Sequence, residues 1–129
     1  MPVETVHSVL IFLVLLQVKH FICDGPLQTS AKVKDKGVYG RPRGILHAGI
    51  HGVGTLVALL LFGLAAQTAL MLAALDFVLH YHIDFSKEQT VRRAGWTTAV
   101  PQFWWALSAD QMLHQLTYLL LAYLTFTAA

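Results

Sequence analysis

The residues of this sequence that could do chemistry are histidines and aspartates repeated at a spacing of four. The pairs are, in chain order, His20 and Asp24, His47 and His51, His80 and Asp84, and Asp110 and His114. Four residues turn a helix by about 400°, so both side chains of a pair leave the same face, with about 6 Å of rise between them. Imidazole and carboxylate are ligands that zinc, iron and manganese accept, so the spacing indicates a metal site.

The set of candidate ligands is larger than a single ion requires, since one ion takes about three to six protein ligands. The sequence therefore predicts either two ions or additional side chains that orient the ligands. The candidate metal ligands are His20, Asp24, His47, His51, His80, Asp84, Asp110 and His114. The candidate acid–base residues are Asp76, Asp110 and Tyr118. Tyr118 lies one turn beyond His114, where its hydroxyl would donate to a ligand, act as a general acid, or only pair helices.

Three other interpretations of these residues remain open. A polar ladder that joins helices through hydrogen bonds between His and Asp would have the same spacing. A proton or ion pathway would also place ionisable residues on the inward faces of membrane helices. Haem is a further alternative, because histidines on facing helices can ligate its iron, but the aspartates would then have no role. The metal site is favoured because four pairs share the same spacing and are expected to lie at the same end of their helices.

The elements that must position these residues are long and apolar. Hydrophobic residues make up 56% of the chain and charged residues 12%, with a mean hydropathy of +0.58, whereas soluble proteins are about a quarter charged. We expect an all-α, polytopic membrane protein: a four-transmembrane-helix bundle forming a single domain over residues 1–129. The expected helices span about residues 3–24, 45–63, 65–85 and 103–128, each near the roughly 20 residues that cross a bilayer. Gly49, Gly52 and Gly54 fall inside a helix and favour close helix packing over a phosphate-binding loop.

The lysines and arginines predict the orientation of this bundle. All of them fall in or beside the first and third connections, so the positive-inside rule places both connections in the cytoplasm and both termini outside. The expected location is the cell inner membrane. The first connection is expected to be a basic loop, and the third, which carries the tryptophans, an interfacial segment before Pro101 opens the last helix.

Partners follow from the same charges. The lipid bilayer and its anionic headgroups are the expected partners, no nucleic-acid partner is expected, and a homo-oligomer or a larger membrane assembly remains open. Lys87, Arg92 and Arg93 are the candidates for holding an anionic substrate near the site.

Four sequence blocks resemble a known family. "HFICDGPLQT", "LHAGIHG", "LHYHIDFSK" and "ADQMLHQLTYL" are similar, in order and spacing, to the blocks of a bacterial and phage family of small polytopic inner-membrane proteins known as a domain of unknown function. The resemblance implies that the family pattern includes Asp24, Gln28, His47, His51, His80, Asp84, Lys87, Asp110, Gln111 and His114. His82 and the Gly25–Pro26 pair depart from it. The family implies no activity.

We therefore infer the expected function from the candidate histidines and aspartates themselves. We expect an intramembrane His/Asp site near the cytoplasmic face that binds a divalent transition metal (Zn, Mn or Fe), with two ions as one option. A metal-dependent hydrolase acting on a lipid or lipid-linked phosphate is the favoured reaction class, with an unligated Asp or His as general base. The alternative is a non-enzymatic metal-binding or proton- or ion-translocating membrane subunit. A di-iron oxygenase is a third option, which would require bound iron and consumption of oxygen.

Overall fold

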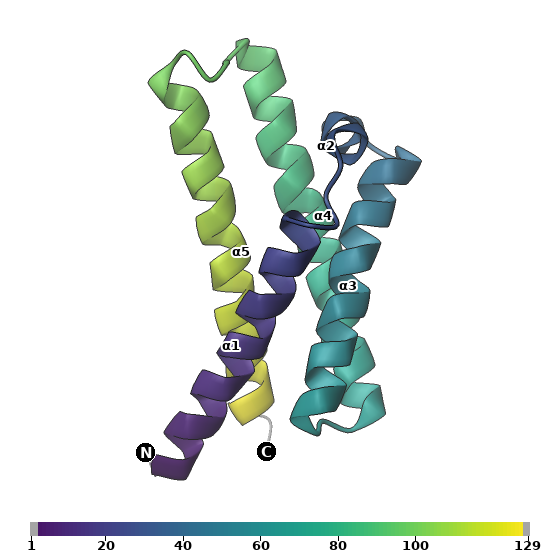
Figure 1. Ribbon diagram of the computed structural model, residues 1–129, viewed down its shortest axis with the longest axis vertical. Coiled ribbons are helices and arrows are strands. Elements are labelled where there is room, and N and C mark those ends of the chain that lie inside the picture. Colours follow the sequence, from purple (N-terminus) through teal and green to yellow (C-terminus); the bar gives the residue numbers. More distant parts are fainter. Residues whose placement is uncertain (1–2, 128–129) are drawn as a thin grey trace.

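The chain forms a bundle of four long helices and one short one in a computed structural model that describes residues 3–127. The helices are α1 (Val3–Asp24), α2 (Ser30–Lys36), α3 (Pro42–Phe62), α4 (Ala66–Ala94) and α5 (Pro101–Thr127). Figure 1 shows both termini and the α3–α4 turn at one end of the bundle, with α2 beside the start of α3 at the other. The described part of the chain has no strand, and the predicted all-α class is confirmed.

The helix ends follow local signals. Pro42 and Pro101 begin α3 and α5, positions where a missing backbone N–H costs nothing. Gly63 and Gly95 follow α3 and α4 with φ of 99° and 65°, the left-handed conformation that glycine adopts without a steric penalty. The tight turn between α3 and α4 therefore lies where the sequence predicts it.

Two of the predicted connections are wrong in part. The expected interfacial third connection from residue 86 onward is mostly helix, because α4 continues through Ala94 and leaves only residues 95–100 between helices. Lys, Glu, Gln and Arg are good helix formers, and no stop residue occurs before Gly95. The expected basic first loop contains α2, which is capped by the Thr29 hydroxyl accepting from the backbone N–H of Lys32 at 3.4 Å. The predicted end of the last helix at Ala128 lies outside the described residues.

Length and composition allow two of the described helices, α1 and α3, to cross a membrane, rather than the four expected. Two such helices are weak evidence taken alone, since the core helix of a soluble protein or a signal sequence passes the same test. The other two long helices, α4 and α5, are less apolar. Asp76, His80 and Asp84 interrupt the apolar sequence of α4, and Asp110 and His114 that of α5, so the inward-facing polar groups lower their mean hydropathy.

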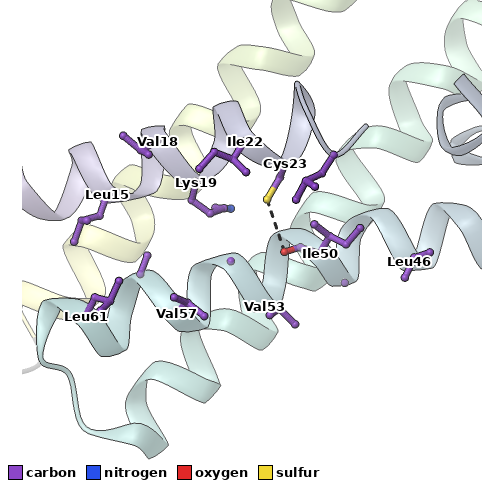
Figure 2. A pocket seen from close by; sticks show the side chains of 14 residues that line it. Leu15, Val18, Lys19, Ile22, Cys23, Leu46, Ile50, Val53, Val57 and Leu61 are labelled. Carbon is purple, nitrogen blue, oxygen red and sulfur yellow. Dashed lines mark hydrogen bonds between the residues drawn. The ribbon is translucent and has the colours of Figure 1, made fainter. Parts of the chain in front are cut away.

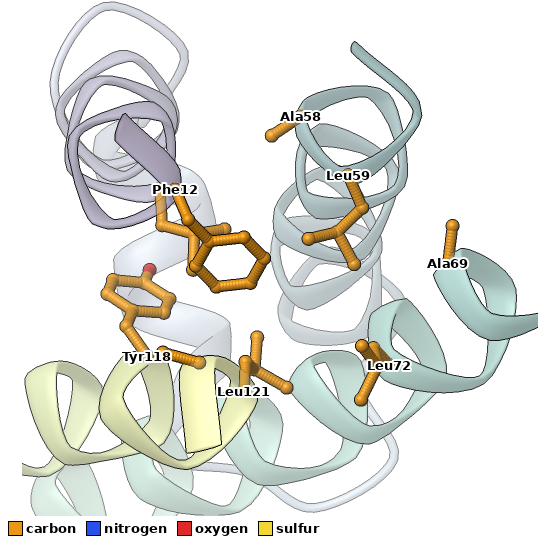
Figure 3. Close-up of a cluster of buried hydrophobic side chains, with 9 residues drawn as sticks. Phe12, Ala58, Leu59, Ala69, Leu72, Tyr118 and Leu121 are labelled. Carbon is orange, nitrogen blue, oxygen red and sulfur yellow. The ribbon is translucent and has the colours of Figure 1, made fainter. Parts of the chain in front are cut away.

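An apolar cluster fills the half of the bundle nearest the termini (Figure 3). Its buried members are Phe12, Leu16, Ala58, Leu59, Ala69, Leu72, Tyr118, Leu121 and Ala122. The ring of Phe12 packs edge-on against Phe62 and Phe126, with centroids 5.2 and 5.6 Å apart. This packing closes the terminal half, so the polar side chains occupy the other half.

The outward faces of the four long helices are apolar. Large exposed hydrophobic side chains include Leu10, Ile11 and Val14 on α1, Val53, Val57 and Leu61 on α3, Leu70, Met71 and Val78 on α4, and Met112, Leu116 and Tyr123 on α5. Soluble monomers rarely expose continuous apolar surface of this extent. In the described chain, ionisable side chains therefore lie inside the bundle and apolar side chains cover its outer surface.

Candidate metal centre

The histidine and aspartate pairs of all four long helices meet in the half of the bundle away from the termini. His20 and Asp24 come from the last turns of α1, His47 and His51 from the first half of α3, His80 and Asp84 from the middle of α4, and Asp110 and His114 from the first half of α5. All are buried except Asp24, which is half-buried. Each pair projects inward from its own helix, and six of the eight predicted metal ligands form groups whose ligand atoms lie within 4.8 Å of one another, while His20 and Asp110 lie beside these groups.

The first group of ligand-type atoms is arranged around Asp24. Its Oδ1 lies 3.0 Å from Nε2 of His47 and 3.1 Å from Nε2 of His51. His80 approaches the same place, with its Nε2 3.4 Å from that of His47. Each of these four side chains offers one ligand atom, and the four atoms all lie within 4.8 Å of one another. This group could hold a metal ion.

The second group is arranged around Asp84 and shares His80 with the first. Asp84 Oδ2 lies 3.3 Å from His80 Nε2, and Asp84 Oδ1 lies 3.5 Å from His114 Nε2. These three side chains also offer ligand atoms within 4.8 Å of one another. Because His80 belongs to both groups, the two form one continuous cluster, and the prediction that a His/Asp cluster could hold a metal ion is confirmed in this sense.

The spacing of the atoms fits metal coordination. Four ligands on a tetrahedron about 2.0 to 2.1 Å from a zinc ion would be about 3.3 to 3.4 Å from each other. The contacts from Asp24 to His47 and His51 and between His47 and His80 are 3.0, 3.1 and 3.4 Å. These three distances are close to the tetrahedral value, and all four ligand atoms lie within 4.8 Å of one another.

Four buried side-chain atoms of the cluster lack a hydrogen-bond partner in the described chain: His47 Nδ1, His80 Nδ1, Asp110 Oδ1 and His114 Nε2. The last two lie 3.7 Å apart. Leaving such atoms unpaired costs about 1 to 3 kcal/mol each. Asp110 Oδ1 and His114 Nε2 are atoms of the kind that ligate metals, so a cation bound between them and Asp84 would remove the cost of leaving them unpaired.

His20 lies beside these two groups and contacts Asp24. Its Nε2 is 3.2 Å from Asp24 Oδ2 and 3.2 Å from Gln111 Oε1. Its Nδ1 is 2.8 Å from the Tyr118 hydroxyl, which already accepts from Lys19 Nζ at 3.1 Å. Tyr118 therefore donates to Nδ1 and leaves Nε2–H to face Asp24. His20 orients Asp24 through this contact, as partners of ligating groups do in known metal sites.

Asp76 is placed one turn deeper than the ligand groups and pairs with Lys19. Its Oδ2 accepts from Lys19 Nζ at 2.9 Å and from the Thr55 hydroxyl at 2.5 Å. Lys19 Nζ is also 3.4 Å from His51 Nδ1. From the sequence, Lys19 was expected to mark the orientation and to compensate part of the charge of the aspartates at the helix ends. A lysine inside an apolar helix, one residue before His20, is a signal that could have indicated a buried partner.

Lys36 is a second basic residue that sequence reasoning missed. Its Nζ lies 3.0 Å from Asp84 Oδ2 and donates to Gln28 Oε1 at 2.7 Å. Lys36 is buried at the end of α2. Because this helix was not expected, the sequence identified Lys36 only as one of the basic residues of the first connection. Among the described residues it is Lys36 that forms an ion pair with a carboxylate of the ligand groups.

The three predicted anion-holding residues lie along the last turns of α4. Lys87 pairs with the neighbouring Glu88, Arg92 donates to the backbone carbonyl of Lys34 in α2, and Arg93 is exposed. Their role toward an anionic substrate stays a prediction. His82 is exposed on the same helix and lies 3.1 Å from the Tyr39 hydroxyl.

The fold and the cluster define a class: an all-α bundle with an ionisable centre and an apolar exterior. The chain belongs to the family described as "Protein of unknown function (DUF3307)", which matches residues 11–129. The predicted resemblance to a domain of unknown function is confirmed, and the match spans every residue of the cluster. No curated protein and no solved structure matches the chain.

Proposed function

We propose that this chain is a membrane protein whose four long helices cross the bilayer and whose buried His/Asp cluster binds one or two divalent transition-metal ions. The observation that carries the proposal is the meeting of Asp24, His47, His51, His80, Asp84 and His114, with ligand atoms in two overlapping groups, inside a bundle whose outside is apolar. Ionisable groups inside a membrane are costly and usually mark functional sites.

The apolar exterior supports four crossings, although among the described helices only α1 and α3 are long and apolar enough by composition. The outward faces of α4 and α5 expose Leu70, Met71 and Val78, and Met112 and Leu116, respectively. These helices have 29 and 27 residues, which at about 1.5 Å per residue exceeds the roughly 30 Å hydrocarbon core. The ends of the helices near α2 carry the Lys and Arg residues, so the positive-inside rule would place this end and the cluster toward the cytoplasm of an inner membrane.

The favoured activity is hydrolysis of a lipid or lipid-linked phosphate. When bound, a metal ion of this class supplies a Lewis acid that polarises phosphoryl oxygens and lowers the pKa of water. Asp110 belongs to neither ligand group, so its buried Oδ1 would be free to accept a proton where it is not used as a ligand. Lys36, at the α2 end of the cluster, would hold an anionic group of the substrate. A lipid is favoured as substrate because it reaches a bilayer-embedded site from the side.

A non-enzymatic role in proton or ion movement is the second candidate, favoured by a continuous polar chain. Contacts run from Lys36 through Asp84 and His47 to Asp24, and on through His51, Lys19 and Asp76 to Thr55. Beyond Thr55 the apolar cluster of Phe12, Leu16 and Leu59 fills the bundle. Because this series of polar contacts ends at buried apolar side chains, it is more consistent with a binding site than with a route across the membrane.

Elemental analysis of the detergent-purified protein by plasma mass spectrometry tests the proposal. We expect one or two equivalents of zinc, manganese or iron, lost after chelation and lowered in His51→Ala and Asp84→Ala. The matched control is His82→Ala, which removes an exposed histidine of α4 and should keep the wild-type metal content. The absence of metal from protein prepared without chelator, or equal content in all variants, would overturn the metal site and move the proposal to the second candidate.

A further inference from the structure

A groove runs along the outside of the bundle between α1 and α3 (Figure 2). Its volume is about 670 Å³, within the range of about 300 to 1,000 Å³ that is typical of ligand pockets. The walls are mainly apolar and include Leu15, Ile22, Leu46, Val53, Val57 and Leu61. Cys23 also lines it, and its thiol donates to the backbone carbonyl of Ile50 at 3.8 Å. The groove therefore suits a hydrocarbon ligand.

Small residues on α3 leave this space open. Gly49 lines the groove, and a Cβ added there would meet no atom within 4 Å. A Cβ on Gly54 would instead lie 2.7 Å from Cγ of Lys19. The aliphatic stem of Lys19 thus passes over Gly54 and lines the groove, while its ammonium turns inward to Asp76. The side chain of Lys19 therefore extends from the groove to the polar centre.

The dimensions of the groove match one lipid chain. Its lining extends over residues 15–27 of the α1 side and 46–61 of α3, which corresponds to about 18 to 22 Å at 1.5 Å per residue. One leaflet of a hydrocarbon core is about 15 Å deep. The groove runs along the two helices from the apolar half of the bundle to the level of Asp24, so a bound chain would have its polar end beside the cluster.

Basic residues surround that polar end. Lys32 donates to the backbone carbonyl of Leu27, which lines the groove, at 2.7 Å. Arg43 is exposed and precedes the lining residue Leu46 by three positions, so both lie on one face of α3. Across residues 29–43, five basic residues, Lys32, Lys34, Lys36, Arg41 and Arg43, accompany the single acidic Asp35. This charge complements an anionic headgroup, because juxtamembrane lysines and arginines attract anionic lipids.

We propose that the α1–α3 groove binds one hydrocarbon chain of an anionic phospholipid, with the headgroup at Lys32 and Arg43 beside the half-buried Asp24. The inference rests on the proposed membrane function and deepens it, since it assigns the substrate class as an anionic phospholipid and gives the route to the cluster. The phosphate would approach from the α2 side, where Lys36 contacts Asp84.

Photo-cross-linking in lipid nanodiscs tests the groove. The probe is phosphatidylglycerol with a diazirine in one acyl chain, in a phosphatidylcholine background, and adducts are mapped by mass spectrometry. We expect adducts concentrated on groove residues such as Val53 and Val57. Gly49→Phe fills the open space and should abolish them, and Arg43→Gln should lower their yield about fivefold, the contribution expected of one basic residue near an anionic surface.

Two further variants keep this test decisive. Leu113→Phe enlarges an exposed side chain of α5 and should leave the adducts unchanged. Val57→Trp is a second way to fill the groove and is used with Gly49→Phe, each checked for helix content by circular dichroism. The groove proposal is overturned by equal labelling with phosphatidylcholine carrying the same diazirine, or by adducts spread evenly over α5.

Metal content of the same samples separates this inference from the proposed function. Gly49→Phe is expected to lose the lipid adduct and keep its metal. Specific lipid adducts on protein that contains no metal would overturn the metal site and leave the groove standing. Metal at wild-type level in protein without groove adducts would overturn the groove alone.

Discussion

Nε2 of His47 and Nε2 of His80 lie 3.4 Å apart at the centre of the bundle, and both rings are almost completely buried. Two neutral imidazoles share at most one proton across such a contact, and two protonated ones repel each other. The contact also joins the two ligand groups, because His80 belongs to both. A cation near these nitrogens would turn a weak contact into two bonds. We therefore expect substitution in this pair to reduce metal binding more than substitution elsewhere in the cluster.

His80→Ala should remove more metal than any other single substitution. The change takes one ligand from each group, so both ions, or the single ion that the groups share, would lose a bond. His20→Ala should instead keep the stoichiometry and weaken the affinity about 10- to 100-fold, since His20 orients Asp24 from outside the groups. Titration of chelated protein with Zn²⁺ in a calorimeter would measure both quantities. Equal loss of sites in the two variants would contradict the division between ligand and orienting residue.

The ion pair between Lys19 and Asp76 should be required for stability. Both side chains are buried, and removal of one partner leaves an uncompensated charge, which costs about 3 to 5 kcal/mol in buried pairs. Lys19→Met and Asp76→Leu should each lower the free energy of unfolding by this order, and the double variant should recover much of the loss. Unfolding in detergent micelles with increasing dodecyl sulfate would show it. Additive losses in the double variant would mean that the two residues do not act as a pair.

The sequence predicts that the two candidate side chains of each pair lie on one face of their helix. A spacing of four residues defines such a face without reference to other elements. His47 and His51, for example, need only be helical to point the same way. Their convergence with Asp24 and His80 followed from four helices alternating in direction, which short connections and a single polar depth indicate. The faces of the helices were thus determined locally.

The contributions of Lys19 and Lys36 could not be predicted from the sequence in the same way. Lys36 reaches Asp84 only because residues 30–36 form a short helix beside the start of α3, and seven residues carry too little apolar periodicity to show its packing. Lys19 is one residue from His20, so its face is adjacent to that of the ligand and its partner Asp76 lies on a distant helix. The end of α4 was missed because its last turns are polar, a feature that suggests a loop although good helix formers continue the helix.

Gly52 should be needed for the contact between α3 and α4. A Cβ at this position would lie 3.1 Å from Cβ of Phe77 and 3.4 Å from the backbone oxygen of Ala73, so the two helices approach closely there. Gly52→Val would force them apart and should cost about 1 to 3 kcal/mol, the usual penalty for overpacking. Gly49→Val is the matched control, because its Cβ meets no atom within 4 Å. Thermal unfolding of both variants in detergent would test this, and equal midpoints would contradict the close approach.

Removal of metal should destabilise the wild-type protein more than a variant that lacks one ligand. An ion bound to the folded chain alone stabilises it by about 2.7 kcal/mol when its free concentration is 100 times the dissociation constant. Dialysis against a chelator should therefore lower the unfolding midpoint of the wild type, and readdition of Zn²⁺ should restore it. In Asp84→Asn the charge that faces His80 and His114 is lost while the group around Asp24 stays intact, so its midpoint should shift less than that of the wild type under both treatments. If chelator shifts the midpoints of the wild type and Asp84→Asn equally, the metal that stabilises the fold is bound without Asp84.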